Sequence, residues 1–409
     1  MKSPRKSVAN LAMKHRPIRI GFIINPIAGM GGAVGLHGTD AGIHLEAARR
    51  GASQISTQRA AMTLSFLFNS REWLQASSET LFITPEGQMG GDLLQSMIDP
   101  TQIQLIPLKN DSTTAADTKE IAQSLFEHGV DLILFAGGDG TARDIFEVID
   151  EKIPLLGIPA GVKMRSGVFG LHPARVGEVL QRIIVTSSRI ENALPTQDAE
   201  ILDLDENSSD YSSSQFFGVA KTPYAPDLLQ RSKSASGDSG ASALDELALH
   251  YAKAMKPKRL YIFGPGGSTN RILKSLGLSL SPKGVHAIMD GHCIGEDIGE
   301  AEIAELVARN SECELIVGVI GGQGYLFGRG NQQLSSGVIE AIGWSHIYVL
   351  ASAEKLLELM PTELHMDFHQ PLRNPPPSFL QVHTSSSRTV VCRLIYQVAS
   401  PSTSTLARN

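Results

Sequence analysis

One turn constrains the fold of this chain more than any other stretch: Gly137-Gly138-Asp139-Gly140-Thr141. It follows the apolar run at residues 131–135, which predicts a fully buried strand of a parallel sheet, and it precedes a predicted helix at residues 142–149. A strand, a glycine-rich turn and a helix N-terminus together favour anion binding, because backbone N–H groups point outward and the helix dipole attracts phosphate. The glycines also allow a ligand to approach the backbone closely.

Asp139 is the unusual member of this turn, because a carboxylate repels phosphate. It is therefore expected to take part in chemistry, either by accepting a proton from a substrate hydroxyl or by holding a Mg²⁺ ion that bridges phosphates. A tight strand–helix turn with Asp139 near the helix N-cap fits the spacing equally well. The spacing alone leaves both interpretations open.

Length and charge narrow the class of protein. The chain has 409 residues, enough for two domains with separate cores, and a formal net charge of −6. The negative charge argues against a nucleic-acid partner or a polybasic membrane partner, and no apolar stretch has transmembrane length. Three widely spaced cysteines, Cys293, Cys313 and Cys392, support neither a disulfide framework nor a Cys-rich zinc site. A cytoplasmic location is expected.

Strands and helices alternate over the first part of the chain, which predicts a parallel sheet with crossover helices. Ligands of such sheets bind at the carboxyl ends of the strands. From about residue 192 short strands suggest a second, mixed domain. The expected division is a disordered leader at 1–17, an α/β nucleotide-binding domain at 18–191, a β-rich α+β substrate-binding domain at 192–396 with Ser-rich loops near 208–242, and a disordered tail at 397–409.

A second glycine-rich turn, with Asn25, Pro26 and Gly29, follows the first predicted strand at residues 18–24. It matches neither standard phosphate motif: a Rossmann fingerprint that starts at Gly29 would reach Val34 instead of its third glycine, and the chain has no Gly-Lys-Ser/Thr sequence. The turn can bind phosphate through its backbone amides, or it can simply connect two elements.

Later segments repeat the pattern of a strand followed by glycines. Lys163 follows a predicted strand at 154–161 and suits either a phosphate or solvent. Ser268 and Thr269, beside Gly264 and Gly266, suit either a helix cap or a phosphate. The segment 321–333 is dense in glycines and amides. Arg329 could clamp a phosphate there, Asn331 and Gln332 could contact a base or carboxamide edge, and a glycine-rich turn is the alternative.

Taken together, these motifs resemble the NAD kinase superfamily, which also holds the diacylglycerol and sphingosine kinases. That similarity rests on Asn25-Pro26 and on the turn at 137–141. A closer resemblance is to the ATP-NAD kinase-like branch. It lies in the segments 113–118, 157–164, 264–269 and 321–333, and the similarity extends over roughly residues 18–396.

The resemblance implies an α/β N-terminal domain, a β-rich second domain and an active site between them. It implies transfer of the γ-phosphoryl group of ATP to the 2′-hydroxyl of NAD, with Asp139 as general base and with Mg²⁺ bound through the nucleotide phosphates. Small-molecule nucleotides are the expected partners, and a homo-oligomer is expected. The implied nucleotide-binding residues are Asn25, Pro26, Gly29, Gly137, Gly138, Gly140, Thr141, Lys163, Gly264, Gly266, Ser268, Thr269, Gly322, Arg329, Asn331 and Gln332.

The chain departs from the branch at three places. Arg165 stands where a histidine is usual, His286 stands where an aspartate is usual, and Asp367-Phe368-His369-Gln370 replaces Asp-Thr-Gly-Asp. These departures leave the acceptor open. The alternatives are a kinase of the same fold that acts on another hydroxyl, of a lipid or a small molecule, and a nucleotide-binding regulatory protein without turnover. A lipid acceptor is less favoured, because no exposed apolar segment supplies a groove.

Overall fold

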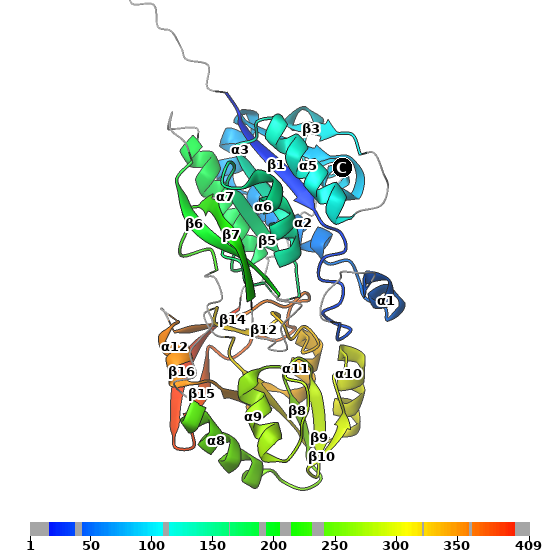
Figure 1. Cartoon of the computed structure of the whole chain (residues 1–409), viewed down its shortest axis with the longest axis vertical. Helices are drawn as coiled ribbons and strands as arrows, with labels where there is room; N and C mark the ends of the chain where they lie inside the picture. Colours follow the sequence, from blue (N-terminus) through cyan, green and yellow to red (C-terminus); the bar gives the residue numbers. More distant parts are fainter. Residues whose placement is uncertain are drawn as a thin grey trace, which may run out of the picture.

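Two sheets organise the chain in the computed structural model. The model describes residues 16–36, 43–108, 114–162, 164–187, 194–204, 214–230, 241–320, 323–359 and 362–396. We call the described residues of 16–230 the N-terminal lobe and those of 241–396 the C-terminal lobe; they form the upper and lower parts of Figure 1. None of the helices within these ranges combines the length and apolar character needed to cross a bilayer.

The N-terminal lobe contains a parallel sheet of five strands in the order β3-β2-β1-β4-β5. The order reverses between β1 and β4, where Ile24 pairs with Ala136, and such a reversal is the usual ligand position in an open α/β sheet. This confirms the predicted α/β architecture. The strands are β1 (Ile18–Ile24), β2 (Thr80–Pro85), β3 (Ile103–Ile106), β4 (Leu132–Gly137) and β5 (Leu155–Pro159).

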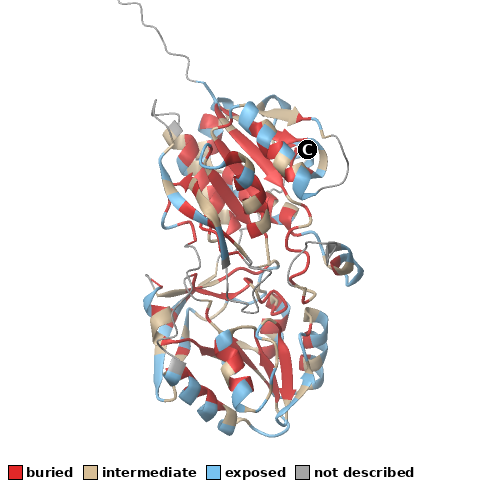
Figure 2. Cartoon of the chain, viewed as in Figure 1, coloured by how far each residue is buried: buried red, intermediate tan, exposed pale blue. Residues whose placement is uncertain are grey.

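Helices cover both faces of this sheet, because the central strands are apolar on both sides. One core joins the sheet to α2 and α7, and another joins it to α5 and α6. In Figure 2 buried residues run along β1, β4 and β5, whereas the outer faces of the helices are exposed. The helices are α1 (Ile43–Arg49), α2 (Ser56–Phe68), α3 (Arg71–Ala76), α4 (Gly91–Gln95), α5 (Ala115–Glu127), α6 (Asp139–Ile149) and α7 (Pro173–Ser187).

An antiparallel hairpin, β6 (Thr196–Leu204) and β7 (Ser214–Pro223), completes the N-terminal lobe. The short strands expected in this region therefore exist, but they are longer than expected and do not join the second sheet. Ala199, Ile201 and Ala220 share the hydrophobic core of α6. The core of the N-terminal lobe therefore includes the hairpin. The boundary between the cores of the two lobes lies after the hairpin, rather than near residue 192 as expected. The Ser-rich segments near 208–242 lie largely outside the described residues.

The C-terminal lobe is built on a mixed sheet of nine strands, in the order β10-β9-β8-β11-β13-β15-β16-β14-β12. Its centre, from β8 to β15, is parallel, and this confirms the strand-rich second part. The strands are β8 (Leu260–Phe263), β9 (His286–Met289), β10 (His292–Gly295), β11 (Cys313–Gly318), β12 (Tyr325–Phe327), β13 (Ile347–Leu350), β14 (Glu363–Met366), β15 (Phe379–Ser385) and β16 (Arg388–Tyr396).

Helices also cover both faces of the second sheet. One core includes residues of α10, α11 and α12, and the other includes residues of α8 and α9. The lobes meet where the loops after β1 and β5 face the loops after β11 and β12 (Figure 1). The helices are α8 (Ala241–Ala254), α9 (Gly267–Ser275), α10 (Glu300–Arg309), α11 (Ser336–Ile342) and α12 (Ala353–Leu357).

Candidate functional site

The loop after β1 and the start of α6 are joined at the reversal of strand order. The Nδ2 group of Asn25 donates to Thr141 Oγ1 at 3.0 Å. The backbone N–H of Asn25 donates to the carbonyl of Ala136 at 2.9 Å. The structure thus brings together the two turns that the sequence predicted separately, at the edge of the sheet where ligands of this fold class bind.

Helix α6 begins at Asp139, three residues before the predicted start at 142. Gly138 is the N-cap residue in an extended conformation, and its carbonyl accepts the N–H of Ala142 at 3.0 Å. Glycine offers no side chain to cap the helix, so the N–H groups of the first turn keep their capacity to bind an anion. The early start puts Asp139 in the first turn of the helix, where the helix dipole stabilises the negative charge of a carboxylate.

The carboxylate of Asp139 is buried and firmly held. Oδ2 accepts the backbone N–H of Arg165 at 2.7 Å. Oδ1 accepts the backbone N–H of Ser166 at 3.0 Å, and Ser166 Oγ lies 2.7 Å from the same oxygen. Burial raises the pKa of Asp139 to about 7, although the contacts with Ser166 oppose this shift. A carboxyl group with such a pKa can gain or lose a proton near neutral pH.

Two glycines permit close contact between the turns around Asp139. Gly29 has φ of +79°, and a Cβ atom on it would lie 2.0 Å from the carbonyl oxygen of Ala160. A Cβ atom on Gly138 would lie 3.0 Å from the Cα atom of Gly161. The loops after β1, β4 and β5 are therefore packed backbone against backbone, tightly at Gly138 and so closely at Gly29 that only glycine fits there.

A second buried carboxylate, Asp367, joins the two lobes. Its Oδ2 atom pairs with the guanidinium of Arg59 from α2 and lies 2.8 Å from Arg329 Nε. His172 Nε2 lies 3.8 Å from Oδ1, which has no hydrogen-bond partner. Burial alone would raise the pKa of Asp367, but the charges of Arg59 and Arg329 outweigh burial and hold that pKa well below its usual range. The carboxylate therefore stays ionised between the lobes.

Two histidines lie beside this ion cluster. Burial lowers the pKa of His172 to about 4, against an opposing effect from Asp367. Burial and the charge of Arg59 lower the pKa of His369 to about 4 as well, and His369 Nδ1 lies 3.2 Å from Arg59 Nη1. Both imidazoles are therefore neutral near pH 7. The cluster brings one anion and two permanent cations together between the lobes.

The segment expected to bind phosphate and base edges lies at this junction. Arg329 is 2% exposed. Besides Asp367, its guanidinium contacts Gln230 Oε1 at 3.2 Å and the carbonyl of Leu171 at 3.2 Å. Gln332 Nε2 donates to the carbonyl of Val162 at 2.6 Å. The contacts of Arg329 and Gln332 join the lobes, and their expected roles toward a nucleotide stay predictions.

Asn331 braces its own loop: it donates to the carbonyl of Leu326 at 2.8 Å and accepts the N–H of Gly328 at 2.9 Å. Its expected role toward a base or carboxamide also stays a prediction. Two further residues named from the sequence, Lys163 and Gly322, lie outside the described residues.

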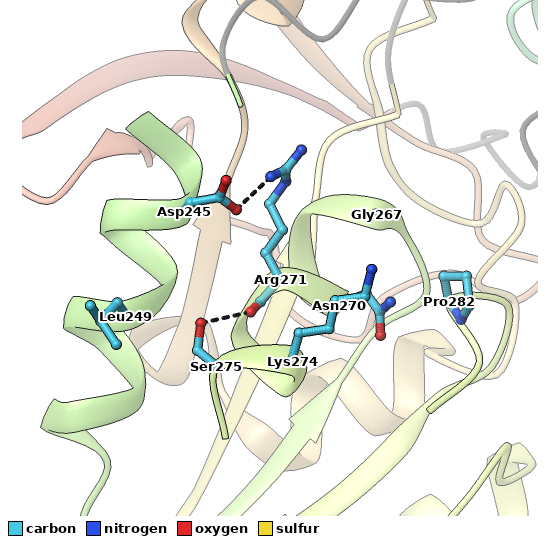
Figure 3. Close-up of a pocket in the computed structure, with 8 residues that line it drawn as sticks. All are labelled: Asp245, Leu249, Gly267, Asn270, Arg271, Lys274, Ser275 and Pro282. Carbon is cyan, nitrogen blue, oxygen red and sulfur yellow. Dashed lines mark hydrogen bonds and ion pairs between the residues drawn. The ribbon is translucent and has the colours of Figure 1, made fainter. Parts of the chain in front are cut away.

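Helix α9 begins at Gly267, directly after the glycine-rich turn of the C-terminal lobe. Ser268 and Thr269 lie inside the first turn of the helix, and Thr269 Oγ1 donates locally to the carbonyl of Gly264 at 2.7 Å. Gly266, with φ of +137°, is the N-cap. An open groove of about 620 Å³ runs beside this helix. Figure 3 shows its residues, with Arg271 paired to Asp245 of α8.

Metal-binding capacity in the described part of the chain is low. Within it, no group of three or more His, Cys, Asp or Glu residues is arranged to hold a metal ion. Asp139 offers two carboxylate oxygens, but backbone and hydroxyl donors already contact both. A Mg²⁺ ion here would depend on substrate phosphates and water for most of its ligands, as Mg²⁺ in kinases commonly does.

Sequence reasoning missed Arg59 and His172, and it noted Asp367 and His369 only as departures from a motif. Residues 59 and 367 are 308 positions apart, so no spacing within one element links them. The available signal was indirect: a single arginine within the otherwise uncharged segment Ser56–Phe68. A buried arginine needs an acceptor, but its identity cannot be obtained from the sequence of the helix.

Comparison with known proteins bears on the N-terminal lobe. Residues 20–187 match the family model described as the ATP-NAD kinase N-terminal domain. Searches of curated proteins and of solved structures gave no match. The matched residues run from β1 to α7 and contain the joined turns at Asn25 and Asp139. This match supports an NAD kinase-like family, and the matched domain supports a kinase that binds nucleotides.

Proposed function

We propose that this protein transfers the γ-phosphoryl group of ATP to the 2′-hydroxyl of NAD and so makes NADP. The observation that carries the proposal is the joined pair of turns at the reversal of strand order, within the matched domain. The uncapped first turn of α6 offers backbone N–H groups to phosphate. The nucleotide phosphates would lie against Gly137, Gly138, Gly140 and Thr141.

Asp139 would accept the proton of the attacking hydroxyl. A pKa of about 7 suits a general base at neutral pH. A carboxylate has about four acceptor positions, and three donors lie within hydrogen-bond distance of Asp139. Oδ2 accepts only one of these three, so it retains a lone pair for the substrate. The 165–166 loop would keep the carboxylate oriented.

Mg²⁺ would enter with ATP and neutralise charge on the phosphates. The protein's own contribution would be positioning, because phosphoryl transfer needs little covalent chemistry from the enzyme. A homo-oligomer and small-molecule partners remain part of this proposal.

The direct test is NADP formation by the purified full-length chain with NAD, ATP and Mg²⁺. Inorganic polyphosphate in place of ATP identifies the donor, and light scattering of the same sample gives the oligomeric state. NADP that accumulates in proportion to enzyme supports the proposal. A phosphorylated product from another hydroxyl compound, with none from NAD, would retain the kinase and replace its acceptor.

Burial of Asp139 favours a second candidate, a nucleotide-binding regulatory protein without turnover. Asp139 is 5% exposed, and its donors come from a loop that it also holds in place, so the carboxylate could be purely structural. Calorimetry separates the two functions. ATP binding without phosphoryl transfer to NAD, NADH or any other tested hydroxyl would favour the regulatory protein.

A further inference from the structure

An ion pair borders the turn at 137–141. Arg143, one helical turn after Asp139 on α6, donates from Nη1 to Asp203 Oδ2 at 2.7 Å. A Cβ atom on Gly140 would lie 3.8 Å from Arg143 Nη2 and 3.9 Å from Asp203 Oδ2. The two charges are therefore separated from the backbone of the turn by about the width of a methyl group. The side chains of Arg143 and Asp203 are 27% and 15% exposed, so both are accessible to a ligand.

The β6–β7 hairpin holds the guanidinium of Arg143 beside the turn. Asp203 lies in β6, and the ring centre of Phe217, in β7, lies 5.6 Å from the guanidinium carbon. Figure 1 shows the hairpin beside α6, and residues of both contribute to one hydrophobic core. Asp203 and Phe217 lie beyond residues 20–187, which match the family model. A part of the chain outside the matched domain thus orients an arginine inside it.

The charges at this place suit an added anion. Arg143 and Asp203 neutralise each other, whereas the first turn of α6 offers a phosphate only partial positive charge, equivalent to about half an elementary charge. A guanidinium presents its N–H donors in a fixed fork. Arg143 can therefore keep Nη1 on Asp203 and donate from Nη2, which lies 3.4 Å from Asp144 Oδ1, to a phosphate oxygen above Gly140.

We propose that Arg143 is a catalytic residue that contacts the transferred phosphoryl group. This rests on the proposed function, which puts the nucleotide phosphates against Gly140. In that reaction the acceptor oxygen bonds to the γ-phosphorus and Asp139 takes the hydroxyl proton. The bond from the γ-phosphorus to the bridging oxygen breaks, and its electron pair leaves with ADP. Asp139 and Arg143 share one face of α6 because they are four positions apart, so Arg143 Nη2 neutralises charge on the γ-phosphoryl oxygens beside the base.

Nucleotide binding to the full-length protein tests Arg143 without requiring turnover. Calorimetry with Mg²⁺ measures the affinities for ATP, ADP and AMP. Arg143→Met should weaken ATP by about 10- to 100-fold, as expected for a lost hydrogen bond to a charged group, and should weaken ADP and AMP by less than about threefold.

Lys119→Met is the matched control. Lys119 carries the same charge as Arg143 and pairs with Asp144 and Glu147, which Arg143 also contacts. It is not among the groups within 4 Å of a Cβ atom on Gly140. Loss of a cation at this distance from the phosphates should change the affinity for ATP by less than about twofold, because solvent screens exposed charges.

Asp203→Asn separates a phosphate contact from a purely structural ion pair. It breaks the same link between α6 and β6 but keeps the guanidinium. It should not weaken ATP, because it removes a negative charge beside the phosphates. Equal losses of ATP affinity in Asp203→Asn and Arg143→Met would overturn the inference. Arg143→Lys replaces Arg143→Met if that variant does not fold; lysine lacks the fork, so ATP should still weaken by about threefold or more.

Turnover distinguishes this inference from the proposed function. Arg143→Met should reduce kcat for NADP formation by about 10²- to 10³-fold, the usual cost of removing one donor to the charge of a transition state. The inference is wrong if Arg143→Met weakens ATP and AMP equally, or if it retains wild-type ATP affinity and kcat. A selective loss of ATP affinity in a protein that forms no NADP would keep the phosphate contact and refute NAD kinase activity. NADP formation with unchanged ATP affinity and kcat in Arg143→Met would do the reverse.

Discussion

Asp139 and Asp367 are both buried carboxylates. Asp139 lies beside the central turn of the N-terminal lobe and Asp367 lies between the lobes, and their pKa values are shifted in opposite directions. Uncharged donors from Arg165 and Ser166 hold Asp139, and burial raises its pKa to about 7. Burial acts on Asp367 as well, but two guanidinium groups outweigh it and lower its pKa. The charge of the partners, rather than the depth of burial, therefore decides which carboxylate can titrate near neutral pH.

The largest expected effect follows removal of the carboxylate that can titrate. If Asp139 is the general base, Asp139→Asn should reduce kcat for NADP formation by about 10²- to 10⁴-fold, because the amide cannot accept the proton. Asp144→Asn is the matched control, since Asp144 lies in the same helix and pairs with Lys119 and Arg143. Coupled detection of NADP measures both variants. Near-normal turnover in Asp139→Asn would reduce Asp139 to a structural residue.

Removal of one of the two cations that contact Asp367 tests how much this carboxylate depends on them for the stability of the protein. Arg329→Met leaves Asp367 with one guanidinium instead of two, and breaking a buried pair of this kind costs about 3–5 kcal/mol of unfolding free energy. The exposed pair of Arg393 with Glu363 supplies the control, and Arg393→Met should cost about 0–1 kcal/mol. Urea unfolding compares the two. Equal losses would show that Asp367 does not depend on its cations.

The histidines beside Asp367 make stability depend on pH in one direction. The native pKa of His172 and of His369 is about 4, below the usual histidine value of about 6.5, so the unfolded chain binds more protons between these pH values. The free energy of unfolding should therefore fall as pH drops from 6.5 to 4, by roughly 3 kcal/mol for each imidazole. Replacement of both by Asn should remove this loss in urea titrations at several pH values.

Asp139 should make the free energy of unfolding change with pH in the opposite direction to the two histidines. Its native pKa is raised, so the native protein binds more protons than the unfolded chain between about pH 4 and pH 7, and this contribution to stability is lost as pH rises. The double histidine variant should thus become less stable on going from pH 4 to pH 7. A flat profile in that variant would contradict the raised pKa of Asp139.

The smallest expected effect is on the pH dependence of catalysis. If deprotonated Asp139 is the base, kcat/KM should rise about tenfold per pH unit below about pH 7 and level off above it. Ser166→Ala removes a contact that lowers the pKa of Asp139, so the midpoint should move to higher pH. Ser275→Ala, at the end of α9, should leave the midpoint unchanged. A downward shift in Ser166→Ala would contradict this account.

The sequence was most informative where structure is set locally. The apolar run before Gly137 predicted a buried strand, and the structure has β4 there with every residue buried. Helix α6 was placed three residues late, because two glycines near its start disfavour helix by propensity. In the structure, Gly138 packs closely against the backbone of Gly161, and this contact compensates for its low helix propensity. Tertiary contacts thus overrode the local preference.

What could not be predicted depends on contacts between distant segments. No helix was assigned before residue 80, although α2 packs with α7 in one core. The strands β6 and β7 were expected in the second domain but pack on the N-terminal lobe, because the sequence of a strand shows which residues are buried but not against which core. The pairing of Arg59 with Asp367 has the same origin: a single sequence shows both charges without showing that they meet.

The contacts that residues 162–171 make across the junction share one direction. Gln323, Tyr325, Arg329 and Gln332 all donate from the C-terminal lobe, and apart from the sulfur of Met164 the acceptors in residues 162–171 are backbone carbonyls. A carbonyl is present whatever side chain its residue carries. A saturation-mutagenesis library should therefore tolerate many substitutions at the acceptor residues Val162 and Leu171, and few at the four donors. The two sides of one interface would then vary at very different rates among functional variants.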